Sequence, residues 1–237
     1  MPGLYRDEGL VLKTMRLGEA DRIVTLLLRD SGKVRAVVKG VRKTKSRWGA
    51  RLEPFTHVDV MLYRGRGELD TVTSAHIVTS FDVLRLDYER LMDAAALVEL
   101  VEKLTPDREN SIATYGLLLS GLHALAAGRG SSVVAAFFVK LLSISGYHPH
   151  VDNCAGCGTT DGLAGFSAAL GGVVCEDCYN EDESAMRAST EDIALMRRFL
   201  ATDITDVEPG HPTVDVTNML RRYAEFHIER PLRSLRV

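Results

Sequence analysis

The sequence predicts an α+β fold, in which an N-terminal β-barrel is followed by an α-helical domain that carries a four-cysteine zinc-finger insertion. Three observations support this fold class. Short runs of β-branched and aromatic residues alternate with turn residues before position 80. Apolar residues then adopt a helical period from about Tyr88, and two Cys-x-x-Cys pairs follow. We therefore expect two domains, residues 1–80 and 81–237, with the insertion at about 150–182.

Five strands are expected in the N-terminal domain, at residues 10–15, 22–28, 33–39, 55–63 and 69–77. Asp30-Ser31-Gly32 is typical of a hairpin turn, and Val58, Val60 and Leu62 share one face of the fourth strand. Five short strands fit a five-stranded OB-fold barrel, whose face and loops bind oligonucleotides. An SH3-like barrel or a small sandwich would give the same pattern and remains an alternative.

The second domain should consist mainly of helices, at residues 88–104, 112–127, 131–146, 189–200 and 214–230. Thr105-Pro106 ends the first of them, and Gly146 suits the residue after the third. Ser189 followed by Asp192 predicts a capping pair at the start of the fourth helix.

The net charge of −3 conceals two domains of opposite sign. Residues 1–80 contain 15 Lys/Arg and 9 Asp/Glu, whereas residues 81–237 contain 14 and 23. A basic module attracts polyanions, and an acidic body repels them. The pattern favours an N-terminal nucleic-acid-binding domain joined to a platform for protein contacts.

Cys154 and Cys157 form one Cys-x-x-Cys pair, and Cys175 and Cys178 form a second pair seventeen residues later. Two such knuckles supply the four sulfurs of a tetrahedral zinc shell. Because protein atoms would fill every position, we expect one structural Zn²⁺ without a catalytic role. Two disulfides or four unrelated thiols are the alternatives.

A second cluster is strongly basic and contains eight cations within nineteen residues that include no carboxylate. It lies on the third expected strand and the loop that follows, where its side chains can face one polyanion. Trp48 lies inside the cluster and either stacks on a base or belongs to the core. We expect sequence-independent phosphate contacts from Arg35, Lys39, Arg42, Lys43, Lys45, Arg47 and Arg51. A solvated charged loop is the alternative.

Several classes of protein are disfavoured. No Walker motif, dinucleotide fingerprint or nucleophile elbow is present. His227-Ile228-Glu229 resembles half of a nucleobase deaminase signature, but it follows the cysteines instead of preceding them. Because these catalytic motifs are missing, we expect a protein that is not an enzyme. No secretory signal or membrane span is recognised, so we expect it to be cytoplasmic and nucleoid-associated.

Short motifs along the whole chain resemble one family, the bacterial recombination mediator and DNA repair protein RecO. No single motif is specific, but their order is. The motifs are Gly18-Glu19-Ala20-Asp21-Arg22, Lys39-Gly40-Val41-Arg42, Ser46-Arg47, Leu52-Glu53-Pro54-Phe55, Arg64-Gly65-Arg66-Gly67-Glu68-Leu69, Gly146-Tyr147-His148-Pro149, Phe166-Ser167, Gly171-Gly172 and Arg230-Pro231-Leu232-Arg233-Ser234-Leu235.

The resemblance implies an OB-fold, a helical domain and a zinc finger, together with annealing of complementary strands. It also implies binding to single- and double-stranded DNA, to RecR and to the acidic C-terminal tail of single-stranded DNA-binding protein, and indirect assistance to RecA. For the tail, Phe137, Phe138 and Leu141 offer a groove, although core packing is the stronger interpretation. The alternative function is a zinc-ribbon and OB adaptor that binds RNA or protein in transcription or translation. A zinc enzyme that acts on nucleobases is a third possible function.

Overall fold

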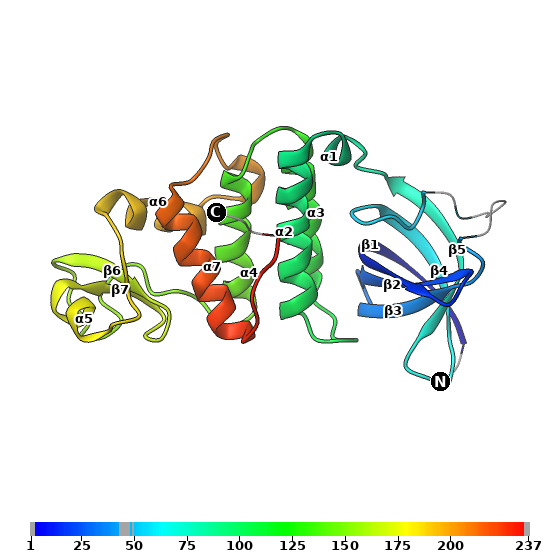
Figure 1. Cartoon of the computed structure of the whole chain (residues 1–237), viewed down its shortest axis with the longest axis horizontal. Helices are drawn as coiled ribbons and strands as arrows, with labels where there is room; N and C mark the ends of the chain where they lie inside the picture. The colour runs from blue at the N-terminus through cyan, green and yellow to red at the C-terminus, as the bar shows by residue number, and fades with distance from the viewer. Residues whose placement is uncertain (1–2, 43–47, 49, 235–237) are drawn as a thin grey trace.

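Five strands close into a barrel in the order β1-β2-β3-β5-β4, as Figure 1 shows. In this computed structural model the described residues are 3–42, 48 and 50–234. β3 and β5 pair in parallel, and the other neighbouring strands are antiparallel. A closed five-stranded barrel of this kind is the expected OB-fold. The strands are β1 (Gly3–Leu17), β2 (Asp21–Leu28), β3 (Gly32–Val38), β4 (His57–Arg64) and β5 (Asp70–Thr79).

β1 is much longer than the expected strand at 10–15. Its first half pairs with β4 and its second half with β2, and a bulge between Val11 and Lys13 lies near this change of partner. The charged residues of the first half interrupt the apolar alternation, which hid the strand in the sequence. Arg6 pairs there with Asp59 of β4, with 2.8 Å between Nε and Oδ1. The bent strand is what closes the barrel.

The interior of the barrel is filled by aliphatic side chains of all five strands, such as Val24, Val34 and Leu62. Trp48 belongs to the same core: it is 3% exposed, and its Nε1 donates a hydrogen bond of 2.9 Å to the carbonyl of Lys39. The core interpretation of Trp48 is therefore confirmed, and base stacking by this side chain is wrong.

The long helices begin and end within two residues of the predicted positions. Ser189 and Asp192 form the expected capping box. A four-residue helix and a 3₁₀ turn were too short to give a periodic signal. The elements are α1 (Val83–Leu86), α2 (Tyr88–Leu104), α3 (Ile112–Ala126), α4 (Ser132–Ile144), α6 (Thr190–Ala201), η1 (Ile204–Asp206) and α7 (Val214–Ile228).

α4 lies at the centre of the helical core. Phe137, Phe138 and Leu141 are no more than 1% exposed, so they pack inside the domain and form no groove for a peptide tail. Among the described residues, no helix combines the length and the apolarity that a bilayer span requires.

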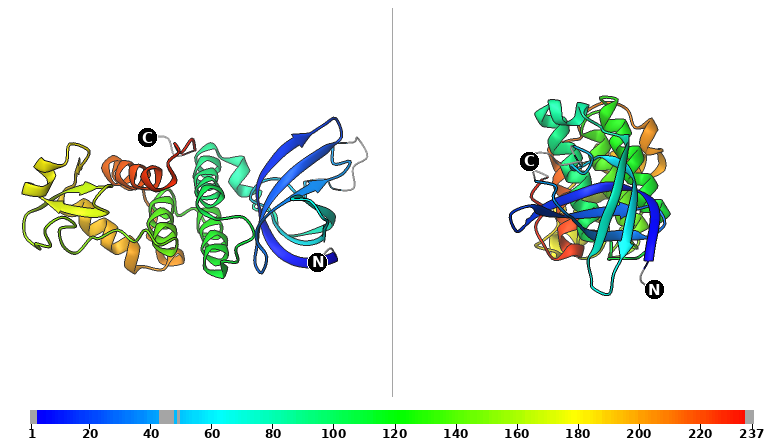
Figure 2. Two further views of the ribbon diagram at one scale, coloured as in Figure 1. Left: turned by 90° about the horizontal axis from the view of Figure 1, so that it is seen from below. Right: turned by 90° about the vertical axis from the view of Figure 1, so that its right-hand side faces the viewer.

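The cysteine segment folds into a small sheet between α4 and α6 in the chain. Its strands lie in the order β7-β6-β8, and a short helix follows β7. In Figure 2 the barrel, the helices and this small sheet lie in a row, with the sheet at the end far from the barrel. The elements are β6 (Leu163–Ser167), β7 (Gly172–Cys175), α5 (Glu176–Glu181) and β8 (Met186–Arg187).

The barrel and the helices share one hydrophobic core. Leu10, Leu27 and Phe55 of the barrel pack in the same cluster as residues of α1 to α4. Next to it, the Oη of Tyr115 on α3 lies 2.8 Å from Nε2 of His57 on β4. Burial lowers the pKa of His57, which favours the neutral ring at this contact.

The loop after α2 attaches the helices to the barrel through a buried carboxylate. Asp70 is fully buried, and Arg108 donates to both its oxygens, at 2.9 and 3.3 Å. Tyr5 donates a third hydrogen bond to Asp70 at 2.5 Å, and burial followed by this bond raises the pKa of Tyr5. The backbone N–H of Arg108 also donates to the carbonyl of Lys33 at 2.8 Å. The orientation of the two domains is therefore fixed by paired polar groups.

Replacing Arg108 with Met should lower the free energy of unfolding by about 2 kcal/mol, because Asp70 loses its main counter-charge while staying buried. Urea denaturation followed by circular dichroism measures this effect. The double variant R108M/D70N removes the charge as well, and it should recover part of the loss. Equal stability of R108M and the unchanged protein would contradict the assigned role.

Candidate functional site

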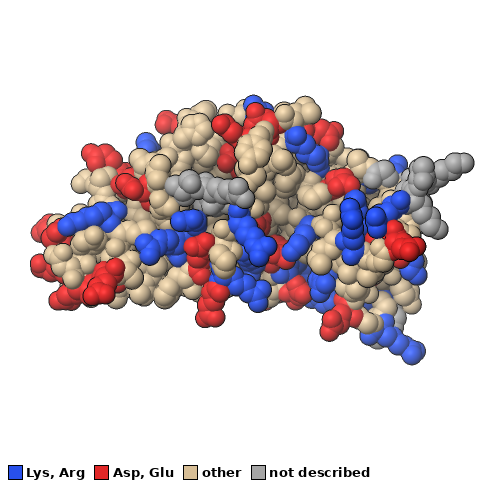
Figure 3. All heavy atoms as spheres, in the orientation of Figure 1, with Lys and Arg blue, Asp and Glu red and all other residues tan. Residues whose placement is uncertain are grey.

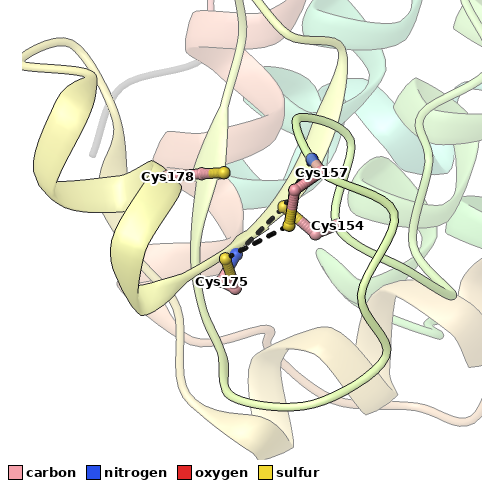
Figure 4. Close-up of side chains that lie close together, drawn as sticks. All are labelled: Cys154, Cys157, Cys175 and Cys178. Carbon is pink, nitrogen blue, oxygen red and sulfur yellow. Dashed lines mark hydrogen bonds between the residues drawn. The ribbon is translucent and has the colours of Figure 1, made fainter.

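The four cysteines converge at one point beside the small sheet, as Figure 4 shows. Cys154 and Cys157 lie in the loop before β6, Cys175 ends β7, and Cys178 lies in α5. Their sulfurs all lie within 4.8 Å of one another, and those of Cys157 and Cys175 are 3.7 Å apart. A tetrahedral ion with bonds of about 2.3 Å would hold its sulfurs about 3.8 Å apart. The cluster therefore fits one metal ion, and no pair is bonded as a disulfide.

The pKa values of the cysteines differ across the cluster. Burial by itself would raise the pKa of Cys154, but hydrogen bonds from backbone N–H groups, first those of Cys157 and Cys175, lower it to about 6. Hydrogen bonds to its sulfur neighbours raise the pKa of Cys178 to about 12. A Cβ at Gly156 would lie 2.9 Å from the sulfur of Cys178, so the first knuckle needs glycine at this position.

Aromatic contacts join α7 to the cysteine module, which comprises the four cysteines and the small sheet, and to the segment just before it. Phe166 of β6 meets Tyr223 edge to face with ring centroids 5.3 Å apart, and Tyr147 stacks on His227 at 4.0 Å. His227 also packs beside Tyr223, as expected, with 4.6 Å between centroids. The ring contacts of His227 explain its place on α7 without the deaminase role that its sequence context resembles.

The outer face of β1, β2 and β3 carries the second candidate site. Strand register aligns Lys13, Thr25 and Arg35 in one row across the three strands. The next row contains Met15, which is 48% exposed, and two further apolar residues of β2 and β3. Cations beside exposed apolar side chains suit a chain of phosphates and bases.

The helical domain forms the other wall of a groove beside this face. The groove has a volume of about 590 Å³ and is bordered by the end of α2 and by the end of α7 and the two residues after it. Lys13 pairs across it with Glu102 at 3.6 Å, and Lys33 pairs with Asp107 at 3.2 Å. Arg35 has no ion-pair partner in the described part of the chain. The lining residues are Lys13, Met15, Thr25, Lys33, Arg35, Glu102, Lys103, Asp107, Ile228, Glu229 and Arg230.

The structure brings only some of the predicted phosphate contacts together. Arg35 lies in the groove, and Lys39 is exposed in the turn after β3. Arg42 is exposed but donates to the carbonyls of Gly18 and Glu19, at 3.2 and 2.9 Å. The half-buried Arg51 donates to the carbonyl of Trp48 at 3.2 Å. Arg42 thus also holds the turn between β1 and β2, and Arg51 also binds the backbone at Trp48.

Three of the predicted contacts, Lys43, Lys45 and Arg47, lie outside the described residues. Sequence reasoning missed Lys13, Lys103 and Arg230, which line the groove from other segments. No local pattern marks them, because each lies outside the basic cluster in the sequence and joins Arg35 only through the fold. Figure 3 shows Lys and Arg side chains along this face of the barrel and the helices, with acidic side chains between them.

Comparisons with known proteins agree on one family along the whole chain. Residues 1–81 match the family model described as "Recombination protein O N terminal", and residues 85–236 match "Recombination protein O C terminal". The chain is 41% identical to the DNA repair protein RecO of a Nocardioides species, over 98% of both chains. It is 40% identical to the DNA repair protein RecO of Thermobifida fusca, over 99% of this chain and 98% of the relative. The chain therefore belongs to the RecO family of DNA repair and recombination proteins.

Proposed function

We propose that the protein is a recombination mediator that binds single-stranded DNA in the groove between the barrel and the helices and anneals complementary strands. The observation that carries the proposal is the row of Lys13, Thr25 and Arg35 on the outer face of an OB barrel, beside an apolar row. Membership of the RecO family supports it. The protein would act on chromosomal DNA without covalent chemistry of its own.

The groove suits a single strand better than a rigid duplex. Cations placed along it neutralise phosphates, whereas Met15 and its apolar neighbours on the sheet offer surface to unstacked bases. Neither kind of contact reads sequence, so binding should depend on salt and little on base composition. The acids in the groove keep its net charge low, which favours release of the paired product.

Annealing needs two strands that otherwise repel each other. A protein that neutralises the phosphates of one strand and leaves its bases accessible raises the chance that a complementary strand pairs with it. The annealed product is a duplex, so binding to double-stranded DNA forms part of the same proposal. No nucleotide hydrolysis is needed.

The partners follow from the family and from the division of charge. We propose that the protein acts with RecR, recognises the acidic C-terminal tail of single-stranded DNA-binding protein, and so assists RecA indirectly. Residues 81–237 carry an excess of nine acidic groups, so an acidic tail would have to meet basic side chains that lie together locally within this domain.

We further propose that the cysteine cluster holds one structural Zn²⁺. Four thiolates are the ligands that structural zinc sites use, and they leave no position for water or substrate. The ion would stabilise the module that packs on α7 through Phe166 and Tyr147.

Replacing both Arg35 and Lys39 with Glu should slow annealing of strands coated with single-stranded DNA-binding protein by at least about tenfold, and it should flatten the log–log salt dependence of DNA affinity by about 1.4. Fluorescence annealing and anisotropy assays measure the two quantities. The matched control is R66E/R198E, which makes the same charge change at two exposed sites that do not line the groove.

Equal rates for R35E/K39E and the control variant would remove the groove from the proposal. A clear preference for single-stranded RNA over DNA in the same assays would favour the alternative of an adaptor in transcription or translation.

Protein purified without chelators should contain about one equivalent of zinc. Removal of the zinc should lower the melting temperature, because the free energy of metal binding that stabilises the folded module is lost. Elemental analysis and differential scanning fluorimetry measure these effects. Binding of short oligonucleotides by the barrel should persist, since the cysteines do not line the groove. Less than about half an equivalent of zinc would contradict the assignment.

A further inference from the structure

α7 borders a second pocket near its beginning, beside the cysteine module. The pocket has a volume of about 460 Å³. It lies between β8 and the outer face of the helix. Its lining residues are Met186, Arg187, Asp215, Asn218, Arg221 and Arg222.

The three arginines of this pocket are held in different ways. Arg187 pairs with Glu176 through both terminal nitrogens, at 2.5 and 2.7 Å, and stacks on the ring of Tyr179 at 4.1 Å. Arg221 donates one hydrogen bond to Asn218, at 3.3 Å. Its Nε is buried and has no hydrogen-bond partner among the described residues. Arg222 is exposed, and the described part of the chain offers it no ion-pair partner.

These features point to an anion with several oxygens. Arg221 and the exposed Arg222 line the pocket without an ion-pair partner among the described residues, so their guanidinium groups can bind ligand oxygens there. Guanidinium groups bind phosphate oxygens in a fixed fork geometry. Asp215 is the one carboxylate among the described lining residues, and Glu176 already neutralises Arg187, so Arg221 and Arg222 are the cations left for an anion.

The lining also distinguishes between nucleic acid and an acidic peptide. Among the described residues, Met186 is the only apolar side chain of the lining, so the pocket offers little surface for the hydrophobic anchors by which peptides dock in grooves. A sugar-phosphate backbone needs no such surface, since its affinity comes mainly from charge.

α7 connects this pocket with the groove at the barrel. Arg222 lines the pocket, and Ile228 and Arg230 line the groove. Ile228 follows Arg222 by six positions on the helix, which is about 9 Å along the axis. In Figure 3 basic side chains occur on the barrel and across the helices, with acidic side chains between them, and the end that holds the cysteine module is mainly acidic. One strand can still reach both places, because the distance along α7 is short.

We propose that the pocket formed by α7 and β8 is a second phosphate-binding site, which holds the backbone of the same DNA strand that lies in the barrel groove. The inference rests on the proposed function, because it extends the DNA path from the barrel to the module. The cysteine module then has a role in DNA binding as well as in stability.

The test compares Arg222→Glu with the unchanged protein on two oligothymidylates in an anisotropy assay. On about 8 nucleotides, a length that one barrel covers, the affinities should be equal. On about 30 nucleotides, R222E should bind about fivefold more weakly, with a salt slope shallower by about 0.7. Asp215→Asn should strengthen binding to the longer strand, and Arg222→Lys should keep most of it. The matched control, R198E, changes an exposed arginine of α6 that lines neither site.

Equal losses for R222E and R198E, or a loss on the short strand as large as on the long one, would overturn the second site. Because Arg222 is exposed and lacks an ion-pair partner among the described residues, its replacement should leave the melting temperature unchanged. If the proposed DNA binding in the barrel groove were wrong, the result would look different. The variant R35E/K39E would then bind both the short and the long oligothymidylate as tightly as its control R66E/R198E.

Discussion

The contact between Arg108 and the buried Asp70 is the constraint on which the groove between the barrel and the helices depends. Asp70 begins β5 inside the barrel, and Arg108 reaches it from the loop between α2 and α3. A fully buried carboxylate needs its charge compensated, so the loop cannot leave the barrel without a large cost. The end of α2 is thereby held against β1 and β3, where Glu102 and Asp107 meet Lys13 and Lys33. The groove exists because the two domains cannot separate freely.

This arrangement also sets how much positive charge the groove presents to a ligand. Lys13 and Lys33 are partly neutralised by acids of the helical domain, whereas Arg35 remains available for phosphate within the described structure. The exposed Met15 adds uncharged apolar surface to the same groove. A surface of mixed charge binds DNA more weakly than an all-cationic groove, and such binding would suit the annealing proposed above, in which the paired duplex must be released.

Much of the fold and the metal cluster could be predicted because their signals are local. The helical repeat of apolar residues in α2 and the capping box at Ser189 depend on residues that are close in sequence. Cys154 and Cys175 likewise belong to recognisable Cys-x-x-Cys pairs. The groove could not be predicted, because Arg35 and Arg230 approach each other only after both domains have packed. The density of basic residues in the sequence did not show which of them are free to bind phosphate. Arg42 lies in the basic cluster, yet its guanidinium donates to backbone carbonyls.

The central claim is that a single strand lies on the sheet of β1, β2 and β3 beside the helices. Photocrosslinking tests this claim most directly, with a benzophenone amino acid in place of Met15 in the groove or of Leu4 on the exposed first half of β1. The account predicts that the probe at Met15 crosslinks to single-stranded DNA in a salt-sensitive manner and that the probe at Leu4 does not. Crosslinking from Leu4 alone would contradict it and place the strand on another face of the barrel.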